Sequence, residues 1–194
     1  MRKLLLFILM LMTSTISVFP QAFSKIPVEK KDKEAVFSLN NEKCRAIFDV
    51  NKDTRRPKIT FTSKNTYFTY NSIFQDSQLD FDIFSNPKSN VSYLLINNYF
   101  DMTRGADLYV IEKNQFKYVG NLNVGAYTKV GGERMNYNSI LPYLSIVYTT
   151  QKTYFSFEVP LVVLNPGQQD EQILEGNKIH YTLTGEKLEQ NFTK

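Results

Sequence analysis

Short runs of apolar, β-branched and aromatic residues recur along the chain from residue 35 onward, separated by Asn, Ser, Asp, Gly and Pro. Such runs, whether they alternate with polar residues or are continuous, are typical of β-strands. No window long enough for a substantial helix has apolar residues at helical spacing, and only residues 168–176 are expected to form a short helical turn. The predicted strands are residues 35–39, 44–50, 57–63, 66–74, 79–84, 91–97, 108–111, 116–119, 140–150, 152–163 and 178–184.

This pattern predicts an all-β fold of antiparallel β-hairpins. Many short strands in one domain form a sandwich, a barrel or a partial propeller, and the sequence leaves these three architectures open. Pro160 falls inside the run 152–163 and lacks the N–H that a strand ladder needs. We therefore expect a sheet edge or a bulge at that point.

The clearest prediction is a hairpin over residues 106–122, with Lys113 and Asn114 as its turn residues. Counting outward from the turn pairs Glu112 with Gln115, Ile111 with Phe116, Val110 with Lys117, Tyr109 with Tyr118, and Leu108 with Val119. Successive pairs fall on alternate faces, so one face is aromatic and apolar and the other is mixed. We expect the first face to lie on a core and the second to face water.

The N-terminal residues indicate export. Arg2 and Lys3 precede a short apolar run, and small residues follow near Ser24, so residues 1–24 resemble a secretory signal peptide that is cut after Ser24. Residues 25–34 are dense in charge and are expected to be a flexible leader, and residues 35–194 a single all-β domain. We expect a periplasmic location in a Gram-negative bacterium, with secretion as the alternative and no stable membrane span after cleavage.

Charge and cysteine content give little support to several classes of partner. The chain has 23 basic and 19 acidic residues, and loss of Arg2 and Lys3 with the signal lowers the net charge from +4 to +2. The basic residues are scattered among acids, so a nucleic-acid partner is not expected. Cys44 is the single cysteine and can form no internal disulfide. We interpret it as a buried side chain beside Ala46 and Phe48, with a bridge between chains or a reactive thiol as the alternative.

Candidate catalytic residues are few. His180 and Cys44 are far apart and match no catalytic spacing, and we interpret His180 as a half-buried structural residue. Asp80 and Asp82 share one face of the predicted strand 79–84, opposite Leu79, Phe81 and Ile83, and paired carboxylates are what a glycoside hydrolase uses. Solvated acids on a strand face are the commoner case. No cofactor is expected.

Asp49, Asn51 and Asp53 place oxygen ligands at alternate positions between two predicted strands, an arrangement that can hold calcium. Thr54 stands where the glycine of such a loop is needed, and no later acid completes the ligand set. We therefore interpret the segment as a turn in which Asp and Asn side chains bind the backbone, and calcium as the weaker alternative.

Together with the hairpin, this loop resembles the degenerate FG-GAP or VCBS-like hairpin units of bacterial exported β-proteins. The resemblance is carried by Asp49, Asn51 and Asp53, and by Asp101, Gly105, Asp107, Leu108 and the segment 116–122. That broad group includes periplasmic immunity proteins that block peptidoglycan-degrading toxins. The resemblance implies a role in binding or inhibition.

We therefore expect a non-catalytic module that binds a protein, as an inhibitor or immunity protein against a cell-wall-degrading enzyme such as a peptidoglycan hydrolase toxin. The longest break in the strand pattern, residues 123–139, contains three glycines and is interpreted as a functional loop. Its candidate contact residues are Tyr127, Lys129, Arg134 and Tyr137, because Tyr and Arg dominate binding hot spots. Two alternatives stay open: a structural or saccharide-binding domain of the envelope, and a hydrolase that uses Asp80 and Asp82.

Overall fold

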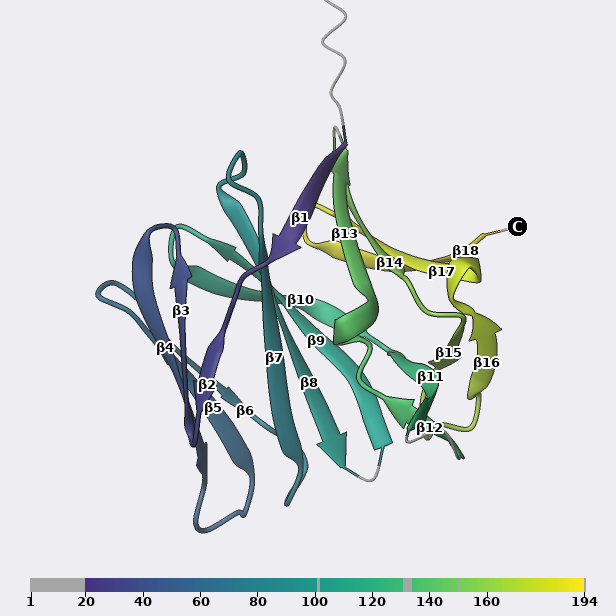
Figure 1. Ribbon diagram of the computed structural model, residues 1–194, viewed down its shortest axis with the longest axis horizontal. Helices are drawn as coiled ribbons and strands as arrows, with labels where there is room; N and C mark the ends of the chain where they lie inside the picture. The colour runs from purple at the N-terminus through teal and green to yellow at the C-terminus, as the bar shows by residue number, and fades with distance from the viewer. Residues whose placement is uncertain (1–19, 101, 131–133, 150, 194) are drawn as a thin grey trace, which may run out of the picture.

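The computed structural model describes residues 20–100, 102–130, 134–149 and 151–193. These residues form three antiparallel sheets (Figure 1), which confirms the all-β fold. The nine-stranded sheet has the order β10 (Gln115–Leu122), β9 (Met102–Glu112), β8 (Val91–Phe100), β7 (Gln78–Ser85), β1 (Gln21–Lys25), β13 (Leu144–Thr149), β14 (Lys152–Phe157), β17 (Ile179–Thr184) and β18 (Lys187–Phe192).

Two smaller sheets pack against the large one. The five-stranded sheet has the order β2 (Glu29–Lys31), β3 (Glu34–Leu39), β4 (Glu42–Val50), β5 (Pro57–Thr62) and β6 (Tyr67–Asn71). The four-stranded sheet has the order β12 (Arg134–Asn138), β11 (Val124–Val130), β15 (Leu161–Leu164) and β16 (Gln172–Glu175). Short 3-10 helices, η1 (Leu141–Tyr143) and η2 (Gly176–Lys178), precede β13 and β17.

The nine-stranded sheet curls until its two edges meet, which makes it a nearly closed barrel. Lys117 on β10 forms an ion pair with Glu186, in the turn before β18. Gly120 on β10 lies so close to Leu188 on β18 that an added Cβ would come within 2.8 Å of the leucine side chain. Side chains bring the two edge strands together, but among the described residues no backbone ladder joins β10 to β18.

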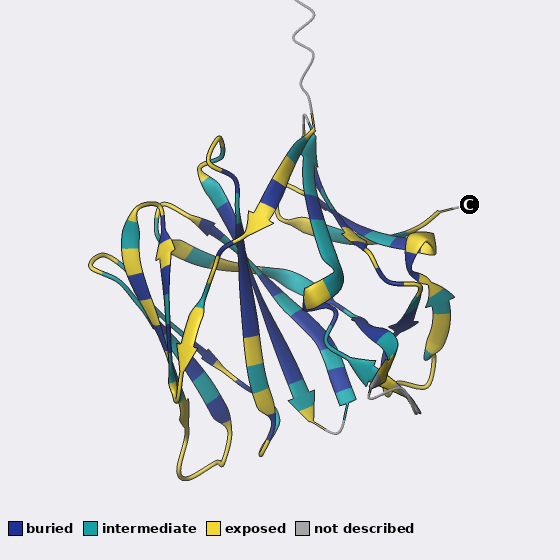
Figure 2. Ribbon diagram, in the orientation of Figure 1, coloured by how far each residue is buried: buried dark blue, intermediate teal, exposed yellow. Residues whose placement is uncertain are grey.

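Strands β7, β8 and β9 separate two hydrophobic cores. The first core joins the inside of the curled sheet to the four-stranded sheet, and the second joins the other face of β7 to β9 to the five-stranded sheet. On β8, Leu94 and Ile96 belong to the second core and Leu95 to the first. Figure 2 accordingly shows long buried stretches on β7 and β8. Burial on both faces explains why residues 91–97 read as a nearly continuous apolar run.

The predicted hairpin is β9 and β10, and its first four residue pairs are confirmed. The fifth is wrong, because Leu108 pairs with Gly120 and Val119 is the extra residue of a β-bulge. The expectation of a wet second face is also wrong for β9. Leu108 lies in the first core and Val110 packs against it, while Tyr109 and Ile111 face the second core.

The predicted flexible leader 25–34 is wrong. Ile26 belongs to the second core and its N–H donates to the Ile83 carbonyl at 2.7 Å, and the charged residues after it form β2. Residues 1–19 of the predicted signal lie outside the described residues. Residues 21–25 form β1, in which Phe23 packs edge to face on Tyr93 at 4.9 Å between ring centroids. A cut after Ser24 would remove most of this strand, so the predicted cut position does not fit the fold.

Three further local predictions differ from the structure. Residues 123–139 contain the paired strands β11 and β12 and are not a long loop. Residues 168–176 contain β16 in place of a helical turn, because Gln172 to Glu175 pair with β15. Pro160 lies in a break between two strands, since β14 stops at Phe157 and β15 starts at Leu161.

Candidate functional site

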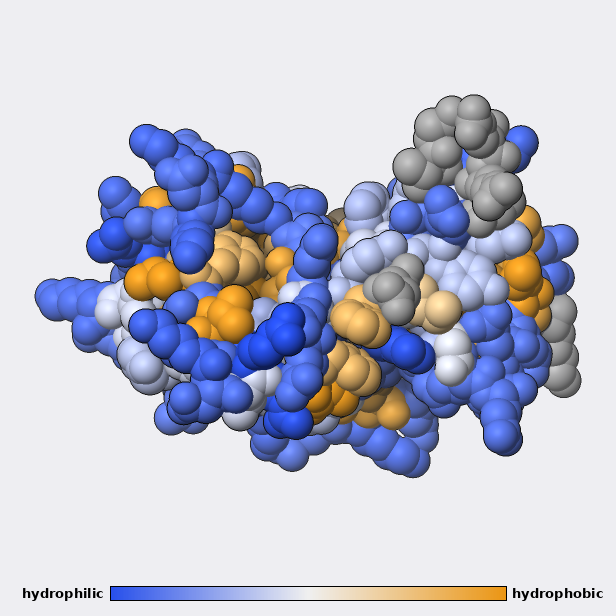
Figure 3. All heavy atoms as spheres, turned by 90° about the horizontal axis from the view of Figure 1, so that it is seen from below, coloured by the Kyte–Doolittle hydropathy of each residue, from blue (hydrophilic) through white to orange (hydrophobic). Residues whose placement is uncertain are grey.

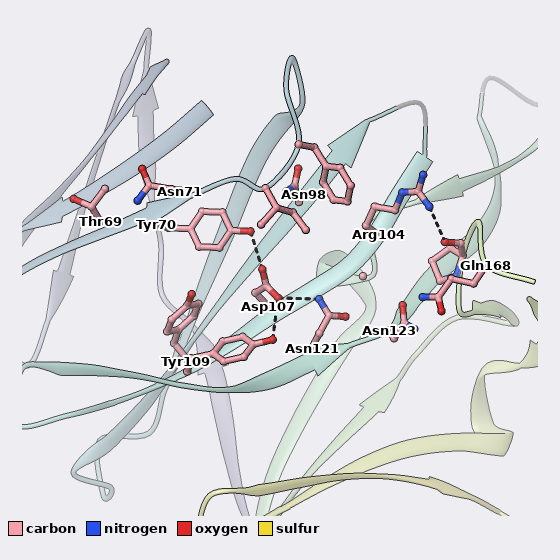
Figure 4. Close-up of a pocket in the computed structure, with 15 residues that line it drawn as sticks. Thr69, Tyr70, Asn71, Asn98, Arg104, Asp107, Tyr109, Asn121, Asn123 and Gln168 are labelled. Atoms are coloured by element: carbon pink, nitrogen blue, oxygen red, sulfur yellow. Dashed lines mark hydrogen bonds between the residues drawn. The ribbon is translucent and has the colours of Figure 1, made fainter. Parts of the chain in front are cut away.

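A cleft of about 670 Å³ lies beside β6, where the five-stranded sheet ends and β9 and β10 continue (Figure 4). Its walls come from four regions of the chain: β6 and the loop after it, β8 and β9, β10, and the loop between β15 and β16. The lining residues are Thr69, Tyr70, Asn71, Ile73, Phe74, Asn98, Arg104, Gly105, Asp107, Tyr109, Tyr118, Asn121, Asn123, Pro166 and Gln168. Amide and aromatic side chains thus predominate over charged ones.

Asp107 lies at the centre of the cleft and accepts hydrogen bonds from three side chains. Tyr70 Oη donates to Oδ2 at 2.7 Å, Asn121 Nδ2 donates to Oδ1 at 2.9 Å, and Tyr118 Oη lies 3.5 Å from Oδ1. These bonds connect the five-stranded sheet to β9 and β10. The carboxylate therefore fixes the relative positions of the tyrosines that line the cleft.

Two β-bulges bring the polar residues of the cleft together. In β10, the extra residue Val119 reverses the alternation, so that Asn121 pairs with Asp107 and Leu122 enters the first core. In β9, Arg104 and Gly105 stand opposite the single residue Asn98 of β8. Bulges of this kind re-aim side chains and are frequent beside functional sites.

Gly105 is required for the bulge in β9. Its φ is +81°, and an added Cβ would lie 2.4 Å from the Leu122 carbonyl oxygen and 2.6 Å from Asn121 Oδ1. The buried Thr103 supports the same turn, since its hydroxyl donates to Asn97 Oδ1 at 2.8 Å and accepts from the Gly105 N–H at 3.3 Å. Gly105 and Thr103 therefore determine the backbone conformation of this bulge.

Three buried side-chain atoms around this cleft have no hydrogen-bond partner. They are Asn98 Oδ1, Arg104 Nε and Asn121 Oδ1. Within the described part of the chain, no other buried side-chain nitrogen or oxygen lacks a hydrogen-bond partner. Nearly all buried polar groups in folded proteins are bonded, and each unbonded one costs about 1–3 kcal/mol. All three residues belong to the walls of this one cleft.

Arg104 spans the end of the cleft. Its Nη1 donates to the Pro166 carbonyl at 3.3 Å, and its guanidinium carbon lies 5.7 Å from the centre of the Phe74 ring. An added Cβ on Gly167 would lie 2.4 Å from Nη1, so the loop after β15 approaches the guanidinium closely. Arg104 therefore joins two loops and still has its Nε unbonded.

The phenols of the cleft are held in their neutral form. Burial, followed by the Asp107 carboxylate, raises the pKa of Tyr70 far above its usual range and the pKa of Tyr109 to about 12. The same two causes raise the pKa of Tyr118. At neutral pH these hydroxyls are therefore hydrogen-bond donors.

Of the contact residues predicted from sequence, Tyr127, Lys129 and Tyr137 do not line this cleft. Tyr127 and Tyr137 face each other across β11 and β12, with 5.5 Å between ring centroids, and Lys129 and Arg134 lie nearer the end of the same hairpin. Tyr137 Oη donates to Glu171 at 2.6 Å, which raises the pKa of Tyr137 to about 12 and lowers the pKa of Glu171. The structure brings these residues into one hairpin.

The Asp49 to Asp53 segment forms the turn predicted as the stronger interpretation. Asn51 Oδ1 accepts from the N–H groups of Asp53 and Thr54, both at 3.0 Å. Asp49 accepts from the Val50 N–H at 2.8 Å and pairs with Lys58 at 3.2 Å, and these two partners lower the pKa of Asp49. The oxygens are thus engaged by the protein itself. The described residues contain no cluster of three or more His, Cys, Asp and Glu side chains able to hold a metal ion.

The other candidate residues have structural partners. Asp80 pairs with Lys30, and Asp82 pairs with Lys25 at 2.6 Å. Asp82 is buried, which raises its pKa, so its expected solvation is wrong. Cys44 is buried and free in the second core, as predicted. His180 is half-buried, 6.1 Å from the ring of Tyr154.

Comparisons of the chain with protein-family models, with curated proteins and with solved structures give no match. In the described part of the chain, no helix has the length and apolar character needed to cross a membrane. The sequence held one signal for the cleft, the Tyr-Val-Gly-Asn segment 118–121, because glycine followed by Asn inside a strand pattern suggests a bulge.

Proposed function

We propose that the protein is an exported binding module that recognises another protein through the cleft beside β6 and inhibits a cell-wall-degrading enzyme. The observation that carries the proposal is the group of unbonded buried atoms at Asn98, Arg104 and Asn121, all in the walls of one cleft. Two acceptors and one donor call for a ligand that offers both kinds of group.

The aromatic content of the cleft favours a protein partner. Tyr118 is 54% exposed and Ile73 is 70% exposed, so both present apolar surface at the rim. Tyrosine and arginine beside apolar surface are the residues that contribute most to protein–protein binding. Figure 3 shows, on the face seen from below, hydrophobic residues in several groups divided by hydrophilic ones. A local contact at the cleft fits this surface better than one broad apolar interface.

A clearance assay on purified peptidoglycan with a panel of lytic hydrolases tests the proposal. The protein is expected to inhibit at least one hydrolase near equimolar amounts. Tyr118→Ala should weaken inhibition at least about 10-fold, as expected for an interface tyrosine. Tyr127→Ala is the matched control and should leave inhibition unchanged. Loss of inhibition in Tyr127→Ala with full inhibition in Tyr118→Ala would assign the contact to the β11–β12 hairpin and refute the role of the cleft.

A saccharide of the envelope is the second candidate ligand. The observation in its favour is the amide-rich lining, which includes Asn71, Asn121, Asn123 and Gln168 together with the exposed ring of Tyr118. Amides can bond sugar hydroxyls, and apolar pockets with a few placed polar groups are typical of small-ligand sites. Calorimetry with soluble peptidoglycan fragments tests this candidate, and binding abolished in Tyr118→Ala would support it.

A further inference from the structure

The five-stranded sheet ends at β6, and β6 has an unpaired side. Within the described residues β6 pairs only with β5, so β6 (Tyr67–Asn71) is an edge strand of its sheet. The cleft is lined from this side by Thr69 and Asn71. The open edge of the sheet and the cleft are therefore one continuous surface.

The register of β6 shows which of its backbone groups face outward. Ser72 N–H donates to the Pro57 carbonyl and Ser63 N–H to the Thr66 carbonyl, so hydrogen-bonded pairs with β5 fall at Ser72, Tyr70 and Phe68. The alternate residues, Tyr67, Thr69 and Asn71, consequently direct their N–H and C=O groups away from β5. No other described strand pairs with these six groups. Such a row is a template for a further strand.

Strand β10, which faces β6, extends beyond the part that β6 covers. Phe116 on β10 is stacked on Phe68 of β6, with ring centroids 4.6 Å apart and an angle of 4° between the planes. The ring centroid of Tyr109 on β9 lies 5.0 Å from that of Phe68. Tyr118 is on the same face of β10 as Phe116, and it remains 54% exposed because no strand lies over it.

We propose that a partner protein adds an extended segment to the free edge of β6, antiparallel or parallel, and that this segment lies over Tyr118 and along the cleft. A strand at about 4.8 Å from β6 and about 10 Å from the facing sheet occupies that position. Its backbone forms hydrogen bonds with the outward backbone groups of Tyr67, Thr69 and Asn71. This mode of recognition is main-chain directed, with pockets for alternate side chains.

The chemistry of the edge defines the partner segment. It has about five residues, matching β6, with no proline where its N–H must meet Thr69 or Asn71. One of its side chains is apolar or aromatic and packs on Tyr118. The inference rests on the proposed function, because it names the kind of partner that the cleft receives.

Selection of phage-displayed random twelve-residue peptides against the full chain supplies the probe, and amide exchange measured by NMR supplies the readout. A bound peptide is expected to slow exchange at least 10-fold at Tyr67, Thr69 and Asn71. Phe68 and Tyr70 already donate to β5 and should change little. An alternation with a period of two is specific to strand addition, because ligands held by side chains do not protect alternate backbone amides.

Two variants and one modified probe complete the test. Thr69→Pro removes an outward N–H and should weaken peptide binding at least 10-fold, whereas Thr69→Ala keeps the N–H and should stay within 3-fold. If Thr69→Pro fails to fold, N-methylation of the peptide at successive residues gives the same information, since alternate positions should abolish binding. Muramyl disaccharide is the probe that competes with the peptide for the cleft.

Selection of no peptide, peptides that leave the exchange of Tyr67, Thr69 and Asn71 unchanged, or edge amides protected by a second copy of the chain would overturn strand addition. The two proposals fail separately. Hydrolase inhibition that is lost in Tyr118→Ala but intact in Thr69→Pro refutes strand addition alone. Peptide pairing on β6 without inhibition of any hydrolase refutes the inhibitory function alone.

Discussion

The five-stranded sheet has two edges of opposite character. The β2 edge has three residues, all charged and exposed, and its Lys30 forms an ion pair with Asp80. The β6 edge has five residues and none is charged. Short, charged edge strands resist pairing with other chains, and longer uncharged ones permit it. The difference indicates that the chain protects one edge and leaves the other available beside the cleft.

The largest expected effect concerns the bulge that shapes the cleft beside β6. Gly105→Ala should lower the free energy of unfolding by about 3–4 kcal/mol, because the left-handed φ and the overlap with the Leu122 carbonyl both disfavour a Cβ. Gly185→Ala is the control, since Gly185 has a φ of +59° and open space around it, and it should cost only about 1–2 kcal/mol. Equal losses in urea unfolding would show that Gly105 is an ordinary turn glycine.

Removal of aromatic rings should distinguish the part of β10 covered by β6 from the part left open. Phe68→Ala removes a ring packed on Phe116 and Tyr109 and should cost about 2–4 kcal/mol. Tyr118→Ala should cost less than about 1 kcal/mol, because the ring is largely exposed. Chemical denaturation measures both. If Tyr118→Ala lowered the free energy of unfolding as much as Phe68→Ala, this would contradict the view that no strand covers Tyr118.

High pH should act on the phenols that join β6 to β9. The pKa of Tyr109 is raised to about 12 in the folded protein, against about 10 in the unfolded chain. The folded state therefore holds the proton more tightly, and its contribution to stability is complete below pH 10 and is lost as the pH rises toward 12. Tyr109→Phe cannot ionise and should show a smaller fall in the free energy of unfolding between pH 9 and pH 12. An identical fall in wild type and variant would refute this role.

The smallest expected effect on stability concerns the β2 edge. Lys30→Ala should change the free energy of unfolding by less than about 1 kcal/mol, because the ion pair with Asp80 is exposed. Replacement of Glu29, Lys30 and Lys31 together by Thr should instead promote self-association, seen by light scattering. Thr69→Lys in the same background is the control for β6. A triple variant that stays monomeric would show that charge is not what protects the β2 edge.

Alternation along the chain was sufficient to predict the all-β class and most of the β9–β10 hairpin. It failed at Val119, because counting residue pairs outward from the turn assumes that every residue has a partner, and Val119 is an extra residue. It also failed for β11 and β12, where glycines and polar residues obscure the strand pattern although Val124 and Ala126 are fully buried.

The cleft could not be predicted because its parts are distant in sequence. Tyr70 and Asp107 are 37 residues apart and meet only because β6 packs over β9. Asn121 reaches the same carboxylate only through the bulge in β10. Sheet order and the change of alternation at a bulge are tertiary properties, so residue patterns alone indicated the β11–β12 hairpin instead.

Amide exchange in the ligand-free protein is the most direct test of the open edge of β6. The account predicts that the N–H groups of Tyr67, Thr69 and Asn71 exchange near the rate of an unstructured chain. The N–H groups of Phe68 and Tyr70, which donate to β5, should exchange slower by several orders of magnitude. Protection at all five residues in the free monomer would mean that the edge is already paired, and would contradict the account.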